Sequence, residues 1–238
     1  MFNVLLYSLI AGLSVLSGVL LTRRFKNWTK RNTIFLMSFA IGLLLANAFF
    51  HLLPEAIEKS SSWFYWVLFA IITFYFIEHF VIIHSCQEEG CEVHAFGVTS
   101  FLGITFHSLI DGIIIGISFG VGAGIGILTS LAVIFHKTAE GIFTYTLLSS
   151  DEKTRTKAIL LSWIVALAMP VGAVLSFLLI PKTSDVILGN LLAIAAGSFI
   201  YIGASDLIPE THKKQSFWNI FLVILGIVFV FFISKFLE

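Results

Sequence analysis

Charged residues are scarce in this chain. Of its 238 residues, only 12% are Asp, Glu, Lys or Arg, about half the share found in ordinary soluble domains. Hydrophobic residues make up 58% and the mean hydropathy is +1.00, so the sequence lacks the polar surface that a water-soluble protein needs. We therefore predict an integral membrane protein that is embedded in the lipid bilayer.

Other scarcities exclude further classes of protein. The 14 basic residues only equal the 14 acidic ones, so there is no excess of positive charge to bind nucleic acid. Two cysteines, Cys86 and Cys91, cannot build a disulfide framework. The apolar stretches are continuous and do not alternate with polar residues, which excludes a porin-like barrel. The fold class is therefore expected to be all-α, with one transmembrane domain over 1–238.

Eight apolar stretches have the length of about 20 residues that a membrane-spanning helix needs. Their expected bounds are 3–22, 32–53, 63–84, 97–119, 126–149, 157–180, 185–209 and 217–236. The first has no basic residue ahead of it, unlike a signal peptide, and counts as a span.

Basic residues favour the cytoplasmic side of a membrane. Ten of the 14 lie in the loops that follow spans one, five and seven or, for Lys157, at the first residue after such a loop. With an even number of spans, this bias predicts that both termini are extracytoplasmic. The absence of organellar targeting features favours the plasma (inner) membrane of a bacterium.

Two pairs of motifs recur in helices that are expected to run in opposite directions. Span two ends in His-Leu-Leu-Pro-Glu over 51–55, and span seven ends in Asp-Leu-Ile-Pro-Glu over 206–210. Span four carries His-x-x-x-Asp-Gly over 107–112, and span five carries His-x-x-x-Glu-Gly over 136–141. Inverted repeats of this kind are typical of secondary transporters. Chance likeness between helix ends is the alternative for the first pair taken alone.

The second pair of motifs places an imidazole and a carboxylate four residues apart on each helix, and therefore on one face. The four residues are His107, Asp111, His136 and Glu140, about 20 Å from the turn 120–126 at 1.5 Å per residue. Ionisable groups at mid-membrane are costly without a partner, so we predict that a divalent cation binds them. This ligand set suits Zn²⁺, and also Cd²⁺, Fe²⁺ or Mn²⁺. Hydrogen bonding between helices, without metal, is the alternative.

At these residues the sequence resembles the ZIP (Zrt-, Irt-like) family of divalent-metal transporters. The resemblance rests on the motifs at 107–112 and 136–141, on 51–56, and on the stretch 196–210, and it covers essentially the whole chain. It implies eight helices with both termini outside and metal movement toward the cytosol. It also implies a transport site made of His107, Asp111, His136 and Glu140.

The chain departs from the family where many relatives carry a second, adjacent metal site. The corresponding positions here hold Ser108, Lys137 and Met169. A fixed ammonium group repels a second cation in a low-dielectric site, so we expect one metal ion in the transport site. Because the Lys137 side chain cannot reach water from mid-depth, we expect it to pair with Glu140 or Asp111.

Further polar residues are candidates for the metal path. His51 and Glu55 are expected at the outer entrance, and Glu78, Asp206 and Glu210 at the inner exit. Simple solvation at helix ends is the alternative for each of them.

The inner loop from His84 to His94 is dense in residues that bind metals. His84, Cys86, Cys91 and His94 stand there with three glutamates, which predicts a weak metal acceptor or sensor. The spacing is not that of a structural zinc site, and an acidic solvated turn is the alternative.

The leading function is transport of Zn²⁺ or a similar ion toward the cytoplasm by alternating access. An intramembrane zinc-dependent hydrolase is the alternative, but four protein ligands leave no open zinc position and no His-Glu-x-x-His motif occurs. A metal sensor without transport would need a signalling domain, which we do not expect. We therefore predict that the protein is not an enzyme, and a homodimer is an open alternative for its assembly.

Overall fold

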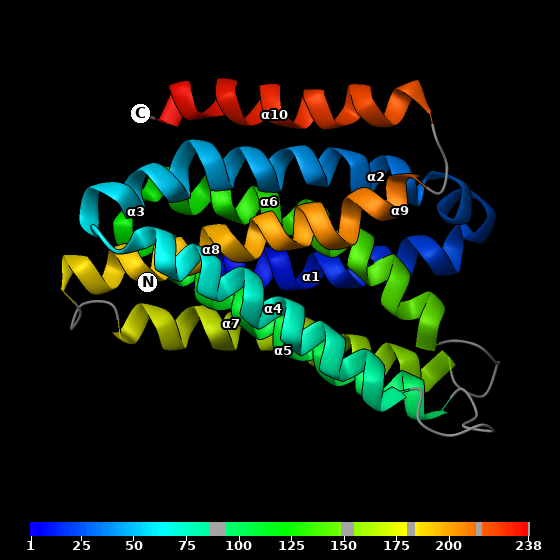
Figure 1. Ribbon diagram of the computed structural model, residues 1–238. Helices are drawn as coiled ribbons and strands as arrows, with labels where there is room; N and C mark the ends of the chain where they lie inside the picture. The colour runs from blue at the N-terminus through cyan, green and yellow to red at the C-terminus, as the bar shows by residue number, and fades with distance from the viewer. Residues whose placement is uncertain (86–93, 149–154, 180–183, 213–215, 238) are drawn as a thin grey trace.

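The computed structural model describes residues 1–85, 94–148, 155–179, 184–212 and 216–237, and these residues form a bundle of roughly parallel helices (Figure 1). Every regular element in those ranges is helical, which agrees with the predicted all-α class. The elements are α1 (Phe2–Arg24), α2 (Lys26–Asn47), η1 (Ala48–Leu52), α3 (Leu53–Lys59), α4 (Trp63–Ser85), α5 (His94–Val121), α6 (Ala123–Leu148), α7 (Arg155–Leu179), α8 (Asp185–Tyr201), η4 (Ile202–Leu207), α9 (Ile208–His212) and α10 (Phe217–Leu237).

The helices have the length and hydropathy of membrane spans. Within the described residues, seven stretches are long and apolar enough to cross a bilayer, and α4 adds the shorter apolar segment Trp63–Ile77. Large hydrophobic side chains remain exposed on the outer helices, including Phe69 on α4, Leu175 on α7 and Ile224 on α10. Since water would not tolerate such surfaces and lipid does, the chain is a multi-pass membrane protein.

Two connections are shorter than predicted. Only Phe25 separates α1 from α2, so the basic stretch 26–31, expected as a loop, is helical. Lys and Arg are good helix formers, and a helix does not have to end where it leaves the apolar layer. Likewise only Gly122 separates α5 from α6, where we expected a turn over 120–126.

Two π-helical segments interrupt the spans that carry the Pro-Glu motifs. Segment η1 precedes Pro54, and η4 precedes Pro209. Proline has no amide hydrogen and its ring collides with the carbonyl four residues earlier. A wider π turn moves that carbonyl away, so the two similar motifs also share a local backbone geometry.

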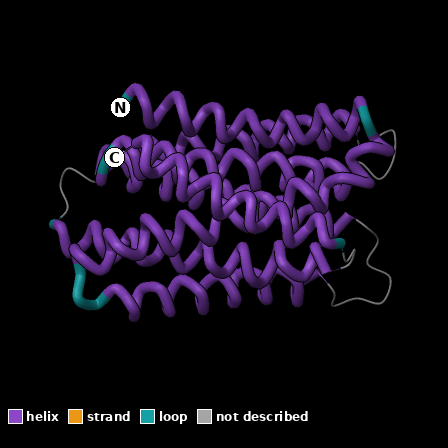
Figure 2. The backbone as a smooth tube through the Cα atoms, turned by 90° about the horizontal axis from the view of Figure 1, so that it is seen from above, coloured by secondary structure: helices purple, strands orange, loops and turns teal. Residues whose placement is uncertain are grey.

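Both chain termini lie at the same end of the bundle, and the turn between α1 and α2 lies at the opposite end (Figures 1 and 2). An even number of crossings requires this arrangement of the termini. We call the two ends the terminal end and the loop end. Arg23, Arg24 and Lys26 flank the loop-end turn.

Helices α1, α5, α6 and α7 pack tightly as one group. On the other side of the bundle α2 pairs mainly with α10, and α4 with α8, while α2 also packs against α6. Glycines allow the close packing within each group. A Cβ at Gly112 would collide with the carbonyl of Met169 on α7, and one at Gly141 with that of Val15 on α1. Gly42 on α2 likewise lies against the carbonyl of Val223 on α10.

Candidate metal centre

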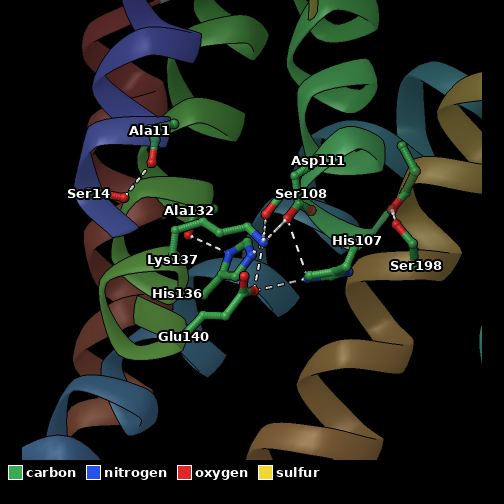
Figure 3. A network of polar contacts seen from close by, with 11 residues as sticks. Ala11, Ser14, His107, Ser108, Asp111, Ala132, His136, Lys137, Glu140 and Ser198 are labelled. Carbon is green, nitrogen blue, oxygen red and sulfur yellow. Dashed lines mark hydrogen bonds and ion pairs between the residues drawn. The ribbon is translucent and has the colours of Figure 1, made fainter. Parts of the chain in front are cut away.

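The two metal-ligand motifs face each other between α5 and α6 (Figure 3). As predicted, the side chains of His107, Asp111, His136 and Glu140 lie together, with one candidate ligand atom from each within 4.8 Å of the others. The spacing of four residues places each imidazole one turn from its carboxylate. The short connection at Gly122 then brings the two helices together at the same depth.

Asp111 Oδ2 is the central atom of this cluster. It lies 3.3 Å from His107 Nε2 and 3.3 Å from His136 Nε2. His107 Nε2 is also 3.5 Å from Glu140 Oε2. Both imidazoles therefore direct a ring nitrogen at carboxylate oxygen.

The second ring nitrogen of His136 defines its tautomer. Nδ1 lies 3.1 Å from the carbonyl oxygen of Ala132, and because a carbonyl only accepts, Nδ1 donates this hydrogen bond. In a neutral ring Nε2 then carries a lone pair that points at a carboxylate oxygen. A cation between the two atoms, either a second ring proton or a metal ion, removes that repulsion, and a backbone partner for the other nitrogen is what metal-binding histidines commonly have.

Two carboxylate oxygens in the cluster are unused. Asp111 Oδ1 and Glu140 Oε1 are buried and have no hydrogen-bond partner among the described residues. Buried acceptors are rarely left in this state. The donor set therefore has spare capacity for a cation.

Lys137 already supplies one cation to this place. Its side chain is 0% exposed, and Nζ lies 2.9 Å from Asp111 Oδ2 and 2.6 Å from Glu140 Oε2. Ser108 Oγ accepts a third hydrogen bond at 3.0 Å. The ion pair predicted for Lys137 is thus present with both carboxylates. Met169, the third residue that replaces a family ligand, is fully buried in the hydrophobic core.

Access to the cluster differs between its two sides. His107 and Glu140, which lie nearer the loop end of their helices, have side chains 20% and 14% exposed. Asp111 and His136, one turn nearer the terminal end, are 0% and 3% exposed. The half of the cluster nearer the loop end is therefore less buried than the half nearer the terminal end.

Aromatic rings of the other helix group cover the cluster. Phe74 on α4 meets the ring of His107 edge-on with a centroid distance of 6.3 Å, and Phe199 on α8 meets His136 at 6.4 Å. The sequence analysis did not identify these two residues. With 25 phenylalanines in the chain, the sequence carries no signal that singles them out.

The predicted entrance residues lie at a cavity near the terminal end. His51 and Glu55 line a cavity of about 380 Å³ together with Glu58, Leu128 and Ser234. Glu55 also pairs with Lys59 at 3.8 Å. Glu58 was not foreseen, although its spacing of three residues from Glu55 could have indicated it.

The remaining predicted residues lie outside what is described. The backbone of Glu78, Asp206 and Glu210 belongs to α4, η4 and α9, and their side chains are not among the described ones. The same holds for His84 and His94, which lie in the last and first turns of α4 and α5. Cys86 and Cys91 fall in the range 86–93, outside the described residues.

A polar pair between the cavity and the cluster was also missed. Asn47 Nδ2 donates a hydrogen bond of 3.0 Å to Thr129 Oγ1, and both residues are 0% exposed. Asn47 lies four residues before His51, in an otherwise apolar run. A lone amide at that spacing was the available signal.

The sequence matches the family model described as ZIP Zinc transporter, over residues 1–95 and 84–234. These ranges include both helices of the cluster and nearly all of the chain.

Individual relatives are also zinc transporters by name. Zinc transporter ZIP13 of Pongo abelii is 27% identical over 223 residues, which cover 85% of this chain and 67% of that protein. Zinc transporter zipt-7.2 of Caenorhabditis elegans is 30% identical over 149 residues, covering 58% of this chain and 32% of that protein. Zinc transporter SLC39A7 of Mus musculus is 26% identical over 148 residues, which cover 60% of this chain and 31% of that protein. The chain thus spans about two thirds of the first relative and about a third of the other two.

The family match, the relatives and the buried histidine-carboxylate cluster lead to the same conclusion, and none of them favours a hydrolase. The chain belongs to the ZIP zinc transporter family and is a metal transporter, not an enzyme.

Proposed function

We propose that this protein carries Zn²⁺ across the plasma (inner) membrane of a bacterium toward the cytoplasm, and that His107, Asp111, His136 and Glu140 are the ligands of the transported ion. The observation that carries the proposal is the convergence of their four ligand atoms within 4.8 Å inside the bundle. Two imidazoles and two carboxylates form a donor set that Zn²⁺ binds well. Cd²⁺, Fe²⁺ and Mn²⁺ are proposed as weaker substrates of the same site.

The orientation is proposed from charge. The turn between α1 and α2 at the loop end carries Arg23, Arg24 and Lys26, and basic residues favour the cytoplasm. The termini are then extracytoplasmic. Because His107 and Glu140, on the loop-end side of the cluster, are less buried than Asp111 and His136, the conformation described here would be the one that releases metal to the cytoplasm.

Alternating access needs a second conformation in which the terminal end opens. The packing supports a motion of one helix group against the other, because both ligand helices belong to the group of α1, α5, α6 and α7. The shared π-helical geometry at Pro54 and Pro209 supports an inverted repeat over the single transport domain 1–238.

The charges of the site favour one metal ion. Asp111, Glu140 and Lys137 together carry a formal charge of about −1 when both imidazoles are neutral. One Zn²⁺ changes this to about +1, whereas a second would raise it to about +3 in a buried site, at high electrostatic cost. We infer that Lys137 takes the place of a second ion and neutralises the carboxylates when the site is empty.

The path on either side of the site is proposed from residue type. His51 and Glu55, which line the terminal-end cavity, would collect metal from outside. Glu78, Asp206 and Glu210 would pass it to the cytoplasm, where the stretch from His84 to His94, with Cys86 and Cys91, would accept or sense it. A homodimer is the proposed assembly, since exposed apolar side chains on α10 such as Ile220 and Phe232 offer a surface for a second copy.

Uptake of zinc-65 into proteoliposomes tests the function directly. A transporter gives uptake that saturates with metal and vanishes in empty liposomes. Saturable binding without accumulation inside the vesicles would contradict the proposal.

A further inference from the structure

The terminal-end cavity and the metal cluster are separated by a tightly packed layer. Leu128 lines the cavity, and His136 lies eight residues farther along α6, which is about 12 Å at 1.5 Å per residue. Between them Ala132 and Val133 of α6 and Leu44 of α2 are fully buried. A cation that enters from the cavity must cross this apolar layer.

One polar pair lies within the layer. Asn47 on α2 is four residues from His51 at the cavity, and Thr129 on α6 is seven residues from His136 in the cluster. Seven residues are two helical turns, so Thr129 and His136 lie on the same face of α6. The hydrogen bond of 3.0 Å from Asn47 to Thr129 joins the two helix groups at this level.

The side-chain amide of Asn47 has two polar atoms, and Thr129 forms a hydrogen bond with only one of them. With Nδ2 bonded to Thr129, the buried Oδ1 has no hydrogen-bond partner among the described residues. If the amide were turned over, Nδ2 would be left instead, so the deficit does not depend on how the amide is assigned. A buried amide atom without a hydrogen-bond partner destabilises the folded protein, so a functional role for it should be considered.

Resting on the function proposed above, we propose that Asn47 is a further metal-contacting residue, whose side-chain oxygen binds the cation as it crosses from the cavity at His51 to the cluster at His136. An amide oxygen is a neutral, hard ligand that binds zinc more weakly than imidazole does. It can replace part of the hydration shell without trapping the ion. Thr129 is a positioning residue that holds the amide when no ion is present.

The proposal separates two variants that break the same hydrogen bond. Asn47→Leu removes the oxygen together with the bond, whereas Thr129→Val removes the bond and leaves the oxygen. If the oxygen binds the passing ion, Asn47→Leu lowers kcat/KM for zinc-65 uptake by about tenfold or more, since a hydrogen bond or ligand to a charged group contributes that much. Thr129→Val should stay within about threefold of the wild type, because it loses only a neutral bond.

Two more variants guard against misfolding and test the chemistry. Asn47→Ala removes the oxygen without adding bulk and should reproduce the loss. Asn47→Asp keeps an oxygen and adds a negative charge, so zinc uptake should persist with a lower KM. The ratio of Mn²⁺ to Zn²⁺ uptake should rise, because carboxylates favour harder ions. Zinc affinity at equilibrium in detergent should match the wild type in Asn47→Leu and Asn47→Ala, because the cluster is intact.

The proposal would be overturned if Asn47→Leu and Thr129→Val lowered zinc uptake equally and Asn47→Asp left the metal preference unchanged. The pair would then be a structural contact only. Wild-type uptake in Asn47→Leu or Asn47→Ala would overturn it as well. The variant His136→Ala is assayed in parallel. If His136→Ala loses zinc uptake while the Asn47 variants retain it, only the role of Asn47 is wrong. If His136→Ala retains zinc uptake, the proposed transport site itself is wrong.

Discussion

Lys137 Nζ lies 2.9 Å from Asp111 Oδ2, the same oxygen that both cluster histidines face. An ammonium group therefore lies in the centre of a donor set that suits a divalent cation. A metal ion that enters must share these oxygens with Lys137. If the cluster binds the transported ion, as we propose, this competition makes the affinity and the number of bound ions depend on a residue that is not itself a ligand.

The cluster histidines should be essential for transport. His107→Ala and His136→Ala each remove one of the four proposed ligands and leave buried carboxylates poorly compensated. We expect zinc-65 uptake to fall by about a hundredfold or more. His212→Ala, at an exposed position at the end of α9, is the control and should transport normally. Normal uptake in both cluster variants would refute the site.

Removing the ammonium should make the metal-free protein less stable and zinc more stabilising. Lys137→Met keeps the length of the side chain but leaves two buried carboxylates without their cation, and breaking a buried ion pair costs about 3–5 kcal/mol. Zinc can supply the missing charge, so the rise in unfolding temperature on adding Zn²⁺ should be larger than in the wild type. Lys157→Met, at an exposed position on α7, serves as the control. An equal zinc response in all three proteins would contradict the competition.

The wild-type protein should hold one metal ion in the transport site. Anomalous diffraction from zinc-loaded crystals should give one peak between α5 and α6. In Lys137→Asp the repulsion is gone and a ligand is added, so a second peak about 3.5–4 Å from the first becomes expected, the separation of two-metal sites. Two peaks in the wild type would rule out the role that we assign to Lys137.

The loop between α4 and α5 should modulate transport without being essential. Replacing His84, Cys86, Cys91 and His94 together with Ser should lower uptake by no more than about a few fold, because the four proposed ligands of the transported ion are all retained. Comparing the uptake rate of this variant with that of the wild type at low and at high zinc concentration would separate a change in metal delivery from a change in regulation. Loss of all flux in a folded variant would make the loop part of the obligatory path.

Close packing behind the cluster should depend on glycine. In Gly141→Ala the new Cβ would collide with the carbonyl of Val15 on α1, and overpacking of this kind costs about 1–3 kcal/mol. Gly122→Ala is the matched control, because nothing lies within 4 Å of its Cβ position. Thermal unfolding in detergent compares them. If both variants unfold at the wild-type temperature, α1 and α6 are not packed as described.

The membrane class, the helical fold and the approximate spans follow from the sequence alone. They depend on hydropathy and length, which are local properties that each segment carries by itself. The pairing of His107 with Asp111 and of His136 with Glu140 is also local, because residues four apart share a helix face. The short turn expected over 120–126 was enough to predict that the two pairs meet at one depth, although the structure reduces this turn to Gly122.

Other features were decided only by the tertiary structure. That Lys137 reaches both carboxylates, that Phe74 and Phe199 cover the histidines and that Asn47 meets Thr129 all depend on how separate helices pack. The residues of the last pair lie 82 positions apart, and no periodicity within either helix encodes their contact. Packing of side chains between helices sets these distances, so the sequence determined which groups are present in the membrane, and the tertiary structure determined which of them touch.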